Sequence, residues 1–312
     1  MNIRKQPMRS LVLIFWVVRF FYYSVKDRSL GFLRFYPGYH GSTIPSMRCV
    51  QDRRERLFAV DARVDDGIDM NRPRQLELLE QFMALYSEFR PSENQVVGKL
   101  YWYNNPMFGF SDAFTLYGIF KSHKPARVIE IGSGFSSALM LDLSREFLPH
   151  TRFTFIDPYS TTIGNVLARN PDGHYELIRE QAQNLDLSVF HQLGENDVLF
   201  IDTSHVVKIG SDLSSIFFEI LPALKPGVLV HIHDIYYPWE YPIEMVMEGR
   251  TYNEVYFVRA FLQFNDAFEI IYNTSQMERE HPDYFRDRMP GYFKESGQSG
   301  GQSLWLRKKR PD

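Results

Sequence analysis

The stretch that decides the fold of this chain is R-V-I-E-I-G-S-G-F-S-S, residues 127–137. Its first half, residues 127–132, is mainly apolar and is typical of a buried parallel strand. Gly132 and Gly134 follow, and glycine allows a tight turn and a close approach of the backbone to a ligand. A helix is expected to open at Ser136, with its N-terminus facing that ligand. The junction predicts a nucleotide-binding turn, although its G-x-G-x-S spacing lacks the third glycine of the dinucleotide fingerprint.

Short apolar runs alternate with helical patterns after residue 100, which is typical of a doubly wound parallel sheet. We expect seven strands, at residues 127–132, 152–157, 175–179, 197–202, 227–233, 267–273 and 303–308. The last strand is expected to run antiparallel between its neighbours. The predicted fold class is α/β, a doubly wound seven-stranded Rossmann-like sheet with an N-terminal helical or irregular extension.

The N-terminal part of the chain differs from the rest in charge. The first sixty residues hold eleven Lys or Arg and three Asp or Glu, a formal charge of +8, whereas the whole chain carries −3, so the remainder carries −11. We expect a basic, apolar arm over residues 1–28, an extension over 29–99 and the sheet domain over 100–312. Apolar residues at helical spacing predict a helix over 75–89, and Ser111 is expected to cap another.

Composition excludes some classes of function. A chain of 312 residues with 44% hydrophobic residues can bury a large core. Its slightly negative net charge gives no global reason to bind nucleic acid, whose usual footprint is strongly basic. The single cysteine, Cys49, excludes an intramolecular disulfide and a multi-cysteine zinc site. This composition suits a reducing, cytoplasmic location. It does not address the oligomeric state.

Residues 11–25 are very apolar but are interrupted by Arg19. They also fall short of the roughly 20 apolar residues that a membrane-spanning helix needs. Two interpretations stay open. In the first, residues 8–28 attach the protein peripherally to a membrane surface. In the second, the segment is a helix that docks on the protein's own body or on a partner.

The predicted strands end in polar residues, and in an open parallel sheet ligands bind outside the carboxyl ends of the strands. Asp157 ends the second strand, 27 residues beyond Glu130. A carboxylate in this place can accept hydrogen bonds from both hydroxyls of a ribose. The alternative is that Asp157 caps the helix that follows.

The fourth and fifth strands end in acids and histidines. Asp202 and His205 follow the fourth strand, and the fifth contributes His231, His233 and Asp234. Alternation along a strand puts the two histidines of the fifth strand on one face. Two carboxylates beside imidazole rings can bind a hard divalent cation, or can pair an acid with a base. We interpret His231 as a buried structural side chain, and the other four residues as functional.

An aromatic, proline-stiffened segment, I-Y-Y-P-W-E-Y-P at residues 235–242, follows the fifth strand. It could stack on a sugar or an aromatic acceptor at the mouth of the site. Equally, it could pack as a lid or form a subunit contact. Trp102, Asn104, Asn105 and Phe108 precede the sheet and could close the opposite side of a site for hydroxylated ligands.

Together, E-I-G-S-G-F-S-S, F-I-D-P, D-V-L-F-I-D-T-S-H and L-K-P-G-V-L-V-H-I-H-D resemble the motifs of the class I S-adenosylmethionine-dependent methyltransferases. Within this family the chain most resembles the group with I-D-x-x-H after the fourth strand and a downstream Asp, here Asp212. The resemblance spans about residues 100–310. It implies that S-adenosylmethionine is bound by Glu130, Gly132, Ser133, Gly134, Asp157, Gln181 and Asp202.

Related magnesium-dependent O-methyltransferases carry acids at the ends of the fourth and fifth strands. This chain matches them with Asp202 and Asp234, which the resemblance makes candidate metal ligands. It departs from them at His233 and Ile235, where those enzymes have a second Asp or an Asn, and magnesium prefers all-oxygen ligation. In a metal-free version, His205 or His233 would act as general base.

We therefore expect an S-adenosylmethionine-dependent methyltransferase that methylates an oxygen of a small-molecule or glycan acceptor, with or without a divalent cation such as Mg²⁺. Two alternatives are a nicotinamide-dependent Rossmann oxidoreductase and a non-catalytic, membrane-associated binding module of the same fold.

Overall fold

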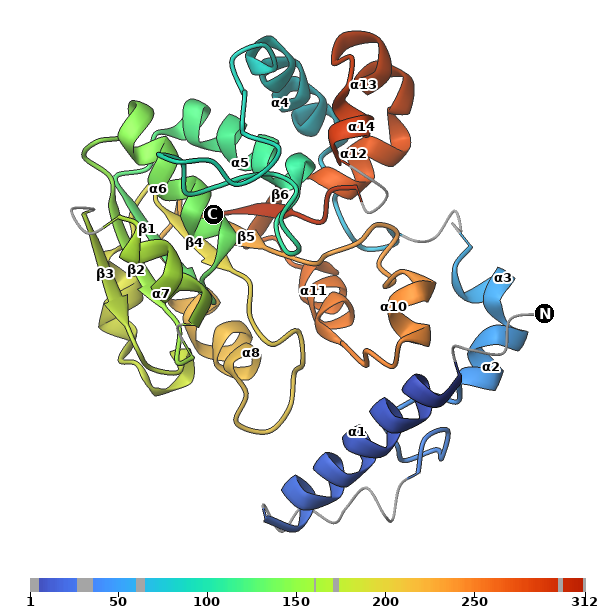
Figure 1. Cartoon of the computed structure of the whole chain (residues 1–312). Coiled ribbons are helices and arrows are strands. Elements are labelled where there is room, and N and C mark those ends of the chain that lie inside the picture. Colours follow the sequence, from blue (N-terminus) through green and yellow to red (C-terminus); the bar gives the residue numbers. More distant parts are fainter. Residues whose placement is uncertain are drawn as a thin grey trace. The chain divides into compact units, whose positions relative to one another are not determined.

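In the computed structural model of the chain, seven strands form one sheet in the order β3-β2-β1-β4-β5-β7-β6 (Figure 1). The strands are β1 (Arg127–Ile131), β2 (Arg152–Ile156), β3 (Tyr175–Ile178), β4 (Val198–Ile201), β5 (Leu229–Ile232), β6 (Phe268–Asn273) and β7 (Leu304–Lys308). β1 pairs in parallel with β2 and β4, and β7 pairs antiparallel with both β5 and β6. The predicted strands and the antiparallel insertion of the last one are confirmed.

The structure describes residues 6–26, 36–59, 65–159, 161–170, 174–296 and 300–310. The chain divides into two compact units. One contains residues 1–59 and 247–251, and the other contains residues 60–246 and 252–312. The predicted domain boundaries at residues 28 and 99 stay predictions.

Helices of the larger unit pack on both faces of the sheet (Figure 1). They are α4 (Arg72–Leu85), α5 (Phe110–His123), α6 (Phe135–Phe147), α7 (Thr161–Ala168), α8 (Asp212–Ser215), α9 (Leu221–Ala223), α10 (Ile243–Met247), α11 (Glu254–Leu262), α12 (Thr274–Glu280), α13 (Pro282–Arg288) and α14 (Tyr292–Ser296). A π-helical turn, Ile216–Ile220, joins α8 to α9, and two short 3₁₀ helices cover Ala182–Asn184 and Leu187–Gln192.

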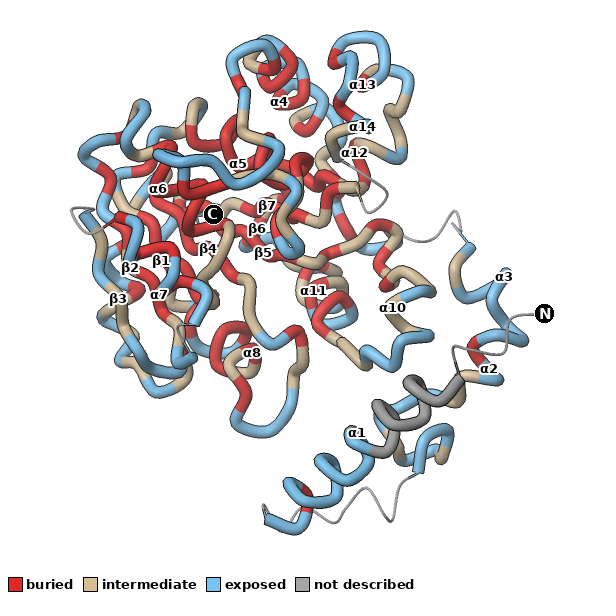
Figure 2. Tube along the Cα trace, viewed as in Figure 1, coloured by how far each residue is buried: buried red, intermediate tan, exposed pale blue. Residues whose placement is uncertain are grey.

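Alternation along each strand divides the core into two layers. On β1, Val128 belongs to the layer under α4 to α7, whereas Ile129 and Ile131 belong to the layer under α8, α9 and α11. Figure 2 shows the strands of the sheet as mostly buried. Both faces are covered, which explains why the strands read as nearly continuous apolar runs. Side chains that can reach a polar ligand are therefore expected at the ends of the strands.

The expected helix start at Ser111 is wrong. α5 begins at Phe110, its N-cap is Gly109, and Ser111 is buried inside the first turn. The physical reason is packing, because Phe110 lies in an aromatic cluster with Tyr86 and Tyr292. The helix expected over residues 75–89 is α4, which begins three residues earlier and ends at Leu85.

The smaller unit contains α1 (Gln6–Lys26), α2 (Met47–Asp52) and α3 (Arg54–Leu57). α1 includes the apolar run at residues 11–25. None of the helices in the described ranges has the combination of length and apolar character needed to cross a membrane.

Candidate functional site

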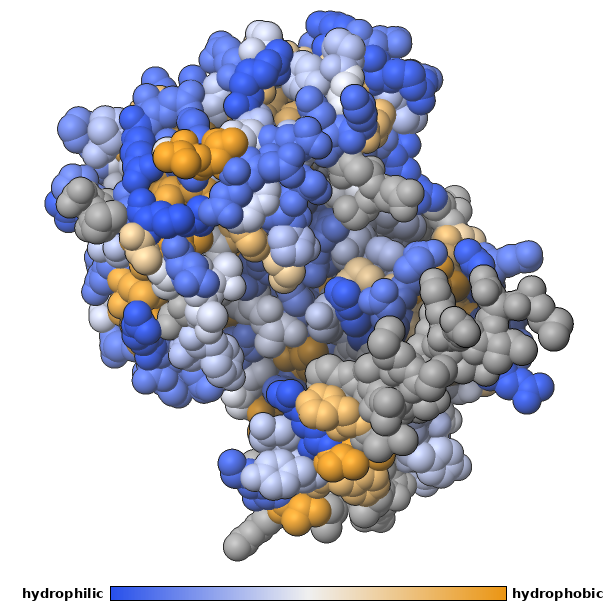
Figure 3. All heavy atoms as spheres, in the orientation of Figure 1, coloured by the Kyte–Doolittle hydropathy of each residue, from blue (hydrophilic) through white to orange (hydrophobic). Residues whose placement is uncertain are grey.

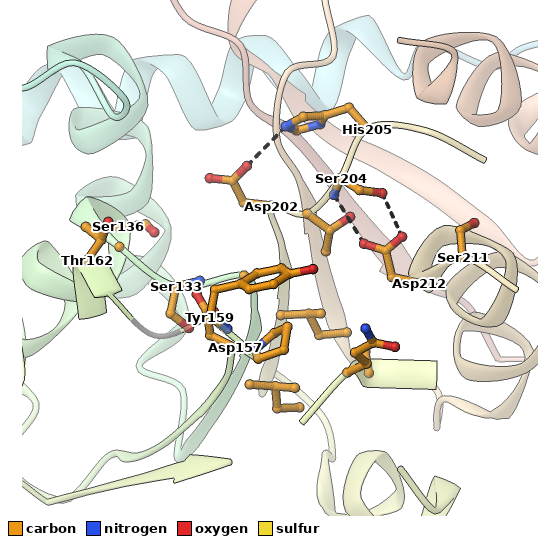
Figure 4. Close-up of a pocket in the computed structure, with 18 of the residues that line it drawn as sticks. Ser133, Ser136, Asp157, Tyr159, Thr162, Asp202, Ser204, His205, Ser211 and Asp212 are labelled. Carbon is orange, nitrogen blue, oxygen red and sulfur yellow. Dashed lines mark hydrogen bonds and ion pairs between the residues drawn. The ribbon is translucent and has the colours of Figure 1, made fainter. Parts of the chain in front are cut away.

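A cavity of about 620 Å³ lies at the carboxyl ends of β1, β2 and β4 (Figure 4). This volume falls within the range of roughly 300–1,000 Å³ that is typical of small-molecule sites. Predicted cofactor residues line it: Gly132, Ser133, Gly134, Asp157, Gln181 and Asp202. The cavity is therefore where an open parallel sheet binds its ligands.

The turn after β1 requires glycine at its first position. Gly132 has a φ of +80°, and a Cβ built there would overlap the carbonyl oxygen of Asp202. Its N–H donates to the carbonyl of Ile156 at 2.9 Å, and the N–H of Asp202 donates to that of Ile131, also at 2.9 Å. Backbone bonds thus join the ends of β1, β2 and β4 directly. A side chain at Gly132 would separate them.

Glu130 lies beneath this turn, outside the cavity wall. Its carboxyl is fully buried and accepts hydrogen bonds from the hydroxyls of Ser136 and Ser137, in the first turn of α6. Burial raises the pKa of Glu130 to about 8, although the two serine bonds act in the opposite direction. Glu130 thus carries a proton at neutral pH and fixes α6 to β1. The structure gives it a positioning role where the sequence predicted cofactor contact.

Asp157 ends β2 at the edge of the cavity. Its carboxylate accepts the backbone N–H of Ser133 at 3.2 Å and that of Tyr159 at 2.8 Å. The first bond ties the glycine turn to the end of β2, and the second closes a local turn in the loop before α7. Neither bond reaches a residue of α7, which begins at Thr161, so the helix-cap alternative stays a prediction. The position of Asp157 in the cavity wall agrees with the predicted ribose contact, which stays a prediction.

Three buried polar atoms belong to residues that line the cavity. Among the described residues, none donates to or accepts from Ser133 Oγ, Gln183 Oε1 or Thr203 Oγ1. Buried polar atoms in native proteins nearly always have a partner, so each such atom needs an explanation. A polar ligand in the cavity is one explanation, provided that these side chains turn toward it.

A cluster of charged side chains follows β4 and β5. His205 Nδ1 lies 2.8 Å from Glu254 Oε2, and its Nε2 lies 3.5 Å from Asp202 Oδ1 and 3.4 Å from Asp234 Oδ2. His205 and Asp234 both have a positive φ, of 58° and 56°, which is uncommon for residues other than glycine. Asp202 and His205 line the cavity, whereas Asp234 and Glu254 lie behind them.

The ionisation of His205 follows from these contacts. Burial lowers the pKa of His205, but the Glu254 hydrogen bond and the charges of Glu254, Asp234 and Asp202 outweigh it and raise the pKa to about 9. The ring is therefore an imidazolium at neutral pH, and both of its nitrogens carry a proton. A protonated ring does not accept a proton, which disfavours the predicted role of His205 as general base.

Asp202 is better placed for that role. Both side chains line the cavity, but that of Asp202 is 26% exposed and that of His205 only 11%. Burial raises the pKa of Asp202, although His233 and His205 act against it. A carboxylate with a raised pKa is a stronger base than an ordinary one.

The two histidines of β5 lie on one face of the sheet, as alternation predicted. His231 stacks on Phe200 with ring centroids 3.7 Å apart and bonds to Ser303 Oγ at 2.9 Å, so its interpretation as a buried structural residue is confirmed. His233 is buried against Phe108, which lines the cavity, and does not line it itself. Burial lowers the pKa of His233, but Asp202, Asp112 and Asp234 reverse this effect and raise it.

The structure does not support a metal site at Asp202 and Asp234. Their oxygens converge on the Nε2 of one imidazolium, which already supplies the positive charge that a cation would bring. In the part of the chain that the structure describes, no group of three or more His, Cys, Asp or Glu side chains could hold a metal ion. The donor set therefore does not fit Mg²⁺, which prefers near-octahedral oxygen ligation.

Sequence reasoning missed several residues of the site. Tyr159, Lys208 and Tyr252 line the cavity, and Glu254 is the closest partner of His205 although it is 49 residues away in the chain. No motif marked Glu254. Asp212, noted only as part of the family pattern, lines the cavity and accepts both the N–H and the hydroxyl of Ser204.

The aromatic segment at residues 235–242 packs on the protein itself. Tyr237 and Trp239 are buried, and both donate hydrogen bonds to Asp65, at 3.1 and 3.2 Å. None of its residues lines the cavity. The structure thus favours a packed segment over an acceptor platform. On the other side, Phe108 does line the cavity, while Asn105 folds its own loop by accepting from the N–H of Met107.

Comparison with known proteins agrees with this geometry. A family model described as a methyltransferase domain matches residues 129–235, which include the glycine turn and the ends of β2, β4 and β5. An uncharacterized protein of Archaeoglobus fulgidus is 33% identical over 180 residues, which cover 54% of this chain and 78% of the relative.

Solved structures resemble the fold at low identity. The O-methyltransferase TomG from Streptomyces achromogenes, involved in tomaymycin synthesis and solved with S-adenosylmethionine, has 12% identity and a TM-score of 0.42, covering 84% of this chain and 96% of that one. An O-methyltransferase from Bacillus cereus, solved with S-adenosylhomocysteine, has 12% identity and a TM-score of 0.39, with coverages of 84% and 97%.

The family assignment does not depend on these two structures. It follows from the domain model, which spans the strand ends around the cavity. On this basis, the chain contains a methyltransferase domain, built on a seven-stranded sheet of the order β3-β2-β1-β4-β5-β7-β6.

Proposed function

We propose that the protein methylates a hydroxyl oxygen of a small or glycosidic acceptor, without a metal ion. One observation carries the proposal: a single cavity is bordered by the glycine turn, by Asp157 and by the Asp202–His205 pair. The first two suit a nucleoside-containing methyl donor. The Asp202–His205 pair suits an acceptor hydroxyl, which must lose its proton during methyl transfer.

In this proposal the turn at residues 132–134 holds the methionine portion of S-adenosylmethionine. Asp157 accepts hydrogen bonds from the ribose hydroxyls, and Gln181 contacts the adenine end. When bound, S-adenosylmethionine supplies a methyl group activated by a positively charged sulfur. The protein's main contribution is then to position the acceptor and to remove its proton.

Asp202 is our candidate for the group that removes this proton. An alcohol hydroxyl is a weak nucleophile while it keeps its proton, and the Asp202 carboxylate reaches the cavity. His205, held as an imidazolium by Glu254 and Asp234, orients the carboxylate through an ion pair. The positive charges of His233 and His205 lower the pKa of Asp202 and so act against burial, which raises it.

Two measurements test the proposal. Calorimetry with S-adenosylhomocysteine should show binding to the wild type. Transfer of a labelled methyl group should then be measured on panels of hydroxyl, amine and thiol acceptors. We expect transfer to hydroxyls, and we expect Asp202→Asn to slow it by about 100-fold or more, with S-adenosylhomocysteine affinity changed by less than about tenfold, a loss of roughly 1.4 kcal/mol.

Three outcomes would contradict the proposal at different points. If folded protein does not bind S-adenosylhomocysteine, the proposed methyl donor is wrong. If transfer is confined to amines or thiols, the proposed oxygen acceptor is wrong. If Asp202→Asn is fully active, Asp202 is not the base. The family assignment already speaks against the nicotinamide alternative, and an NADH titration without binding would agree with that.

A further inference from the structure

The smaller unit exposes apolar side chains of α1. Val18, Tyr22 and Val25 are 62%, 62% and 64% exposed, and Val17 and Tyr23 are also exposed. Figure 3 shows apolar side chains over α1 in the lower part of the view. Single exposed apolar residues are ordinary, but a run of them along one helix marks a surface that binds something.

These apolar residues point in many directions around the helix. At 100° per residue, Val17, Val18, Tyr22, Tyr23 and Val25 cover most of the circumference of α1. Arg19 and Lys26 are seven residues apart and share one narrow strip. A folded protein partner covers one face of a helix, whereas lipid can surround a wide apolar face and leave the charged strip at the headgroups.

The same unit supplies positive charge. Arg48, Arg53, Arg54 and Arg56, in and beside α2 and α3, are all exposed. They contribute to the charge of +8 in the first sixty residues, which contrasts with −11 in the remainder. Each basic residue near an anionic membrane surface adds to the attraction. The charge therefore complements anionic lipid headgroups.

We propose that α1 binds the surface of an anionic membrane, lying in the plane of the interface. Its 21 residues make a helix about 32 Å long. The valines and phenyl rings enter the boundary of the acyl chains, while Arg19, Lys26 and the tyrosine hydroxyls stay among the headgroups. This attachment is independent of methyl transfer, because it involves the other compact unit.

The experiment is vesicle co-sedimentation of the full chain with phosphatidylcholine vesicles that contain or lack about 30% phosphatidylserine. We expect strong binding to the anionic vesicles and weaker binding to the neutral ones. The double variant Val18→Asp/Val25→Asp should lower binding to anionic vesicles by at least tenfold, because it places charge in the apolar interface. Arg19→Glu/Lys26→Glu should lower binding to anionic vesicles and leave binding to neutral vesicles nearly unchanged.

Val97→Asp is the matched control, because Val97 is a fully exposed valine in the larger unit. It should sediment like the wild type. Calorimetry with S-adenosylhomocysteine on each variant separates loss of attachment from loss of the methyltransferase fold. Absence of wild-type binding to either vesicle overturns the proposal, as does equal binding of Val18→Asp/Val25→Asp. The proposal would also be overturned if the wild type formed a dimer and bound no vesicles, and if Val18→Asp/Val25→Asp were monomeric. The apolar face of α1 would then bind a second copy of the chain.

Discussion

The two sides of the cavity are built on different principles. At the ends of β1 and β2, backbone geometry makes the site: Gly132 leaves room for the carbonyl of Asp202, and Asp157 accepts two backbone N–H groups. At the ends of β4 and β5, ionised side chains make it, with His205 between three carboxylates.

The difference teaches which kinds of change each side tolerates. Backbone geometry fails when atoms are added, because the strand ends cannot move apart without losing their bonds. A charged cluster fails when one partner is removed, because the remaining charges stay buried without compensation. Substitutions that add atoms should therefore damage the side built from backbone, and substitutions that remove a charge should damage the side built from ionised side chains.

The largest effect is expected from Gly132→Ala. The new methyl group overlaps backbone and the φ of +80° is strained, so we expect a destabilisation of about 3 kcal/mol or more. S-adenosylhomocysteine binding should also be lost. Urea unfolding and calorimetry measure the two effects. Gly164→Ala in α7 is the matched control, since nothing lies within 4 Å of its Cβ, and this change should keep or slightly raise stability.

The next effect concerns Asp157→Ala. If the carboxylate holds the ribose, we expect the affinity for S-adenosylhomocysteine to fall by about 100-fold, since hydrogen bonds to a charged group contribute roughly 1.5–3 kcal/mol. Asp186→Ala is the control, because Asp186 caps a 3₁₀ helix through Ser188 N and does not line the cavity. An unchanged affinity in Asp157→Ala would leave this residue with its bonds to the backbone of Ser133 and Tyr159 alone.

Glu254→Gln tests the charged side. Because the pKa of His205 is raised from 6.5 to about 9, its contribution to stability is complete below pH 6.5 and is lost as the pH rises through 9. The wild type should lose stability across this interval, and the variant should lose less. NMR titration of His205 should give a lower pKa in Glu254→Gln. Glu244→Gln, at an exposed glutamate in α10, should titrate like the wild type.

The smallest effect is expected from Glu130→Gln at pH 7. Glu130, with a pKa of about 8, already carries a proton there, and glutamine matches its shape and neutral charge. Stability should stay within about 1 kcal/mol, the net value of one hydrogen bond. The raised pKa also means that Glu130 stabilises fully below pH 4.5 and that this contribution is lost as the pH rises through 8. Glu130→Gln should remove that part of the pH dependence, whereas Glu130→Ala should be clearly destabilised at pH 7.

Much of the fold was predictable from the sequence. The seven strands lie within two residues of their predicted bounds, because buried parallel strands require continuous apolar runs. The glycine turn and Asp157 were predictable because each follows a strand directly. Ser111 was misassigned as a cap because the packing of Phe110 extends α5, and packing between distant segments leaves no local signal.

The charged side of the site was only partly predictable. The sequence identified Asp202, His205, His233 and Asp234 but left open whether the two acids bind a metal ion or take part in acid–base chemistry. Glu254 is the first residue of α11, and no sequence motif marked it as a partner of His205. Its neighbour Asn253 holds the loop after β4, because its side-chain oxygen accepts the N–H of Val207 at 2.7 Å. The aromatic segment showed the same limit, because its partner Asp65 is more than 170 residues away.

The sequence by itself determined the sheet, the turn at Gly132 and the carboxyl end at which a ligand binds, since apolar periodicity and glycine act locally. Only the tertiary structure decided the charges there. Three segments of chain meet at His205, and their carboxylates outweigh the desolvation of the ring. Ionisation depends on every charge nearby, regardless of its place in the chain, so the proton on His205 could not be read from local sequence.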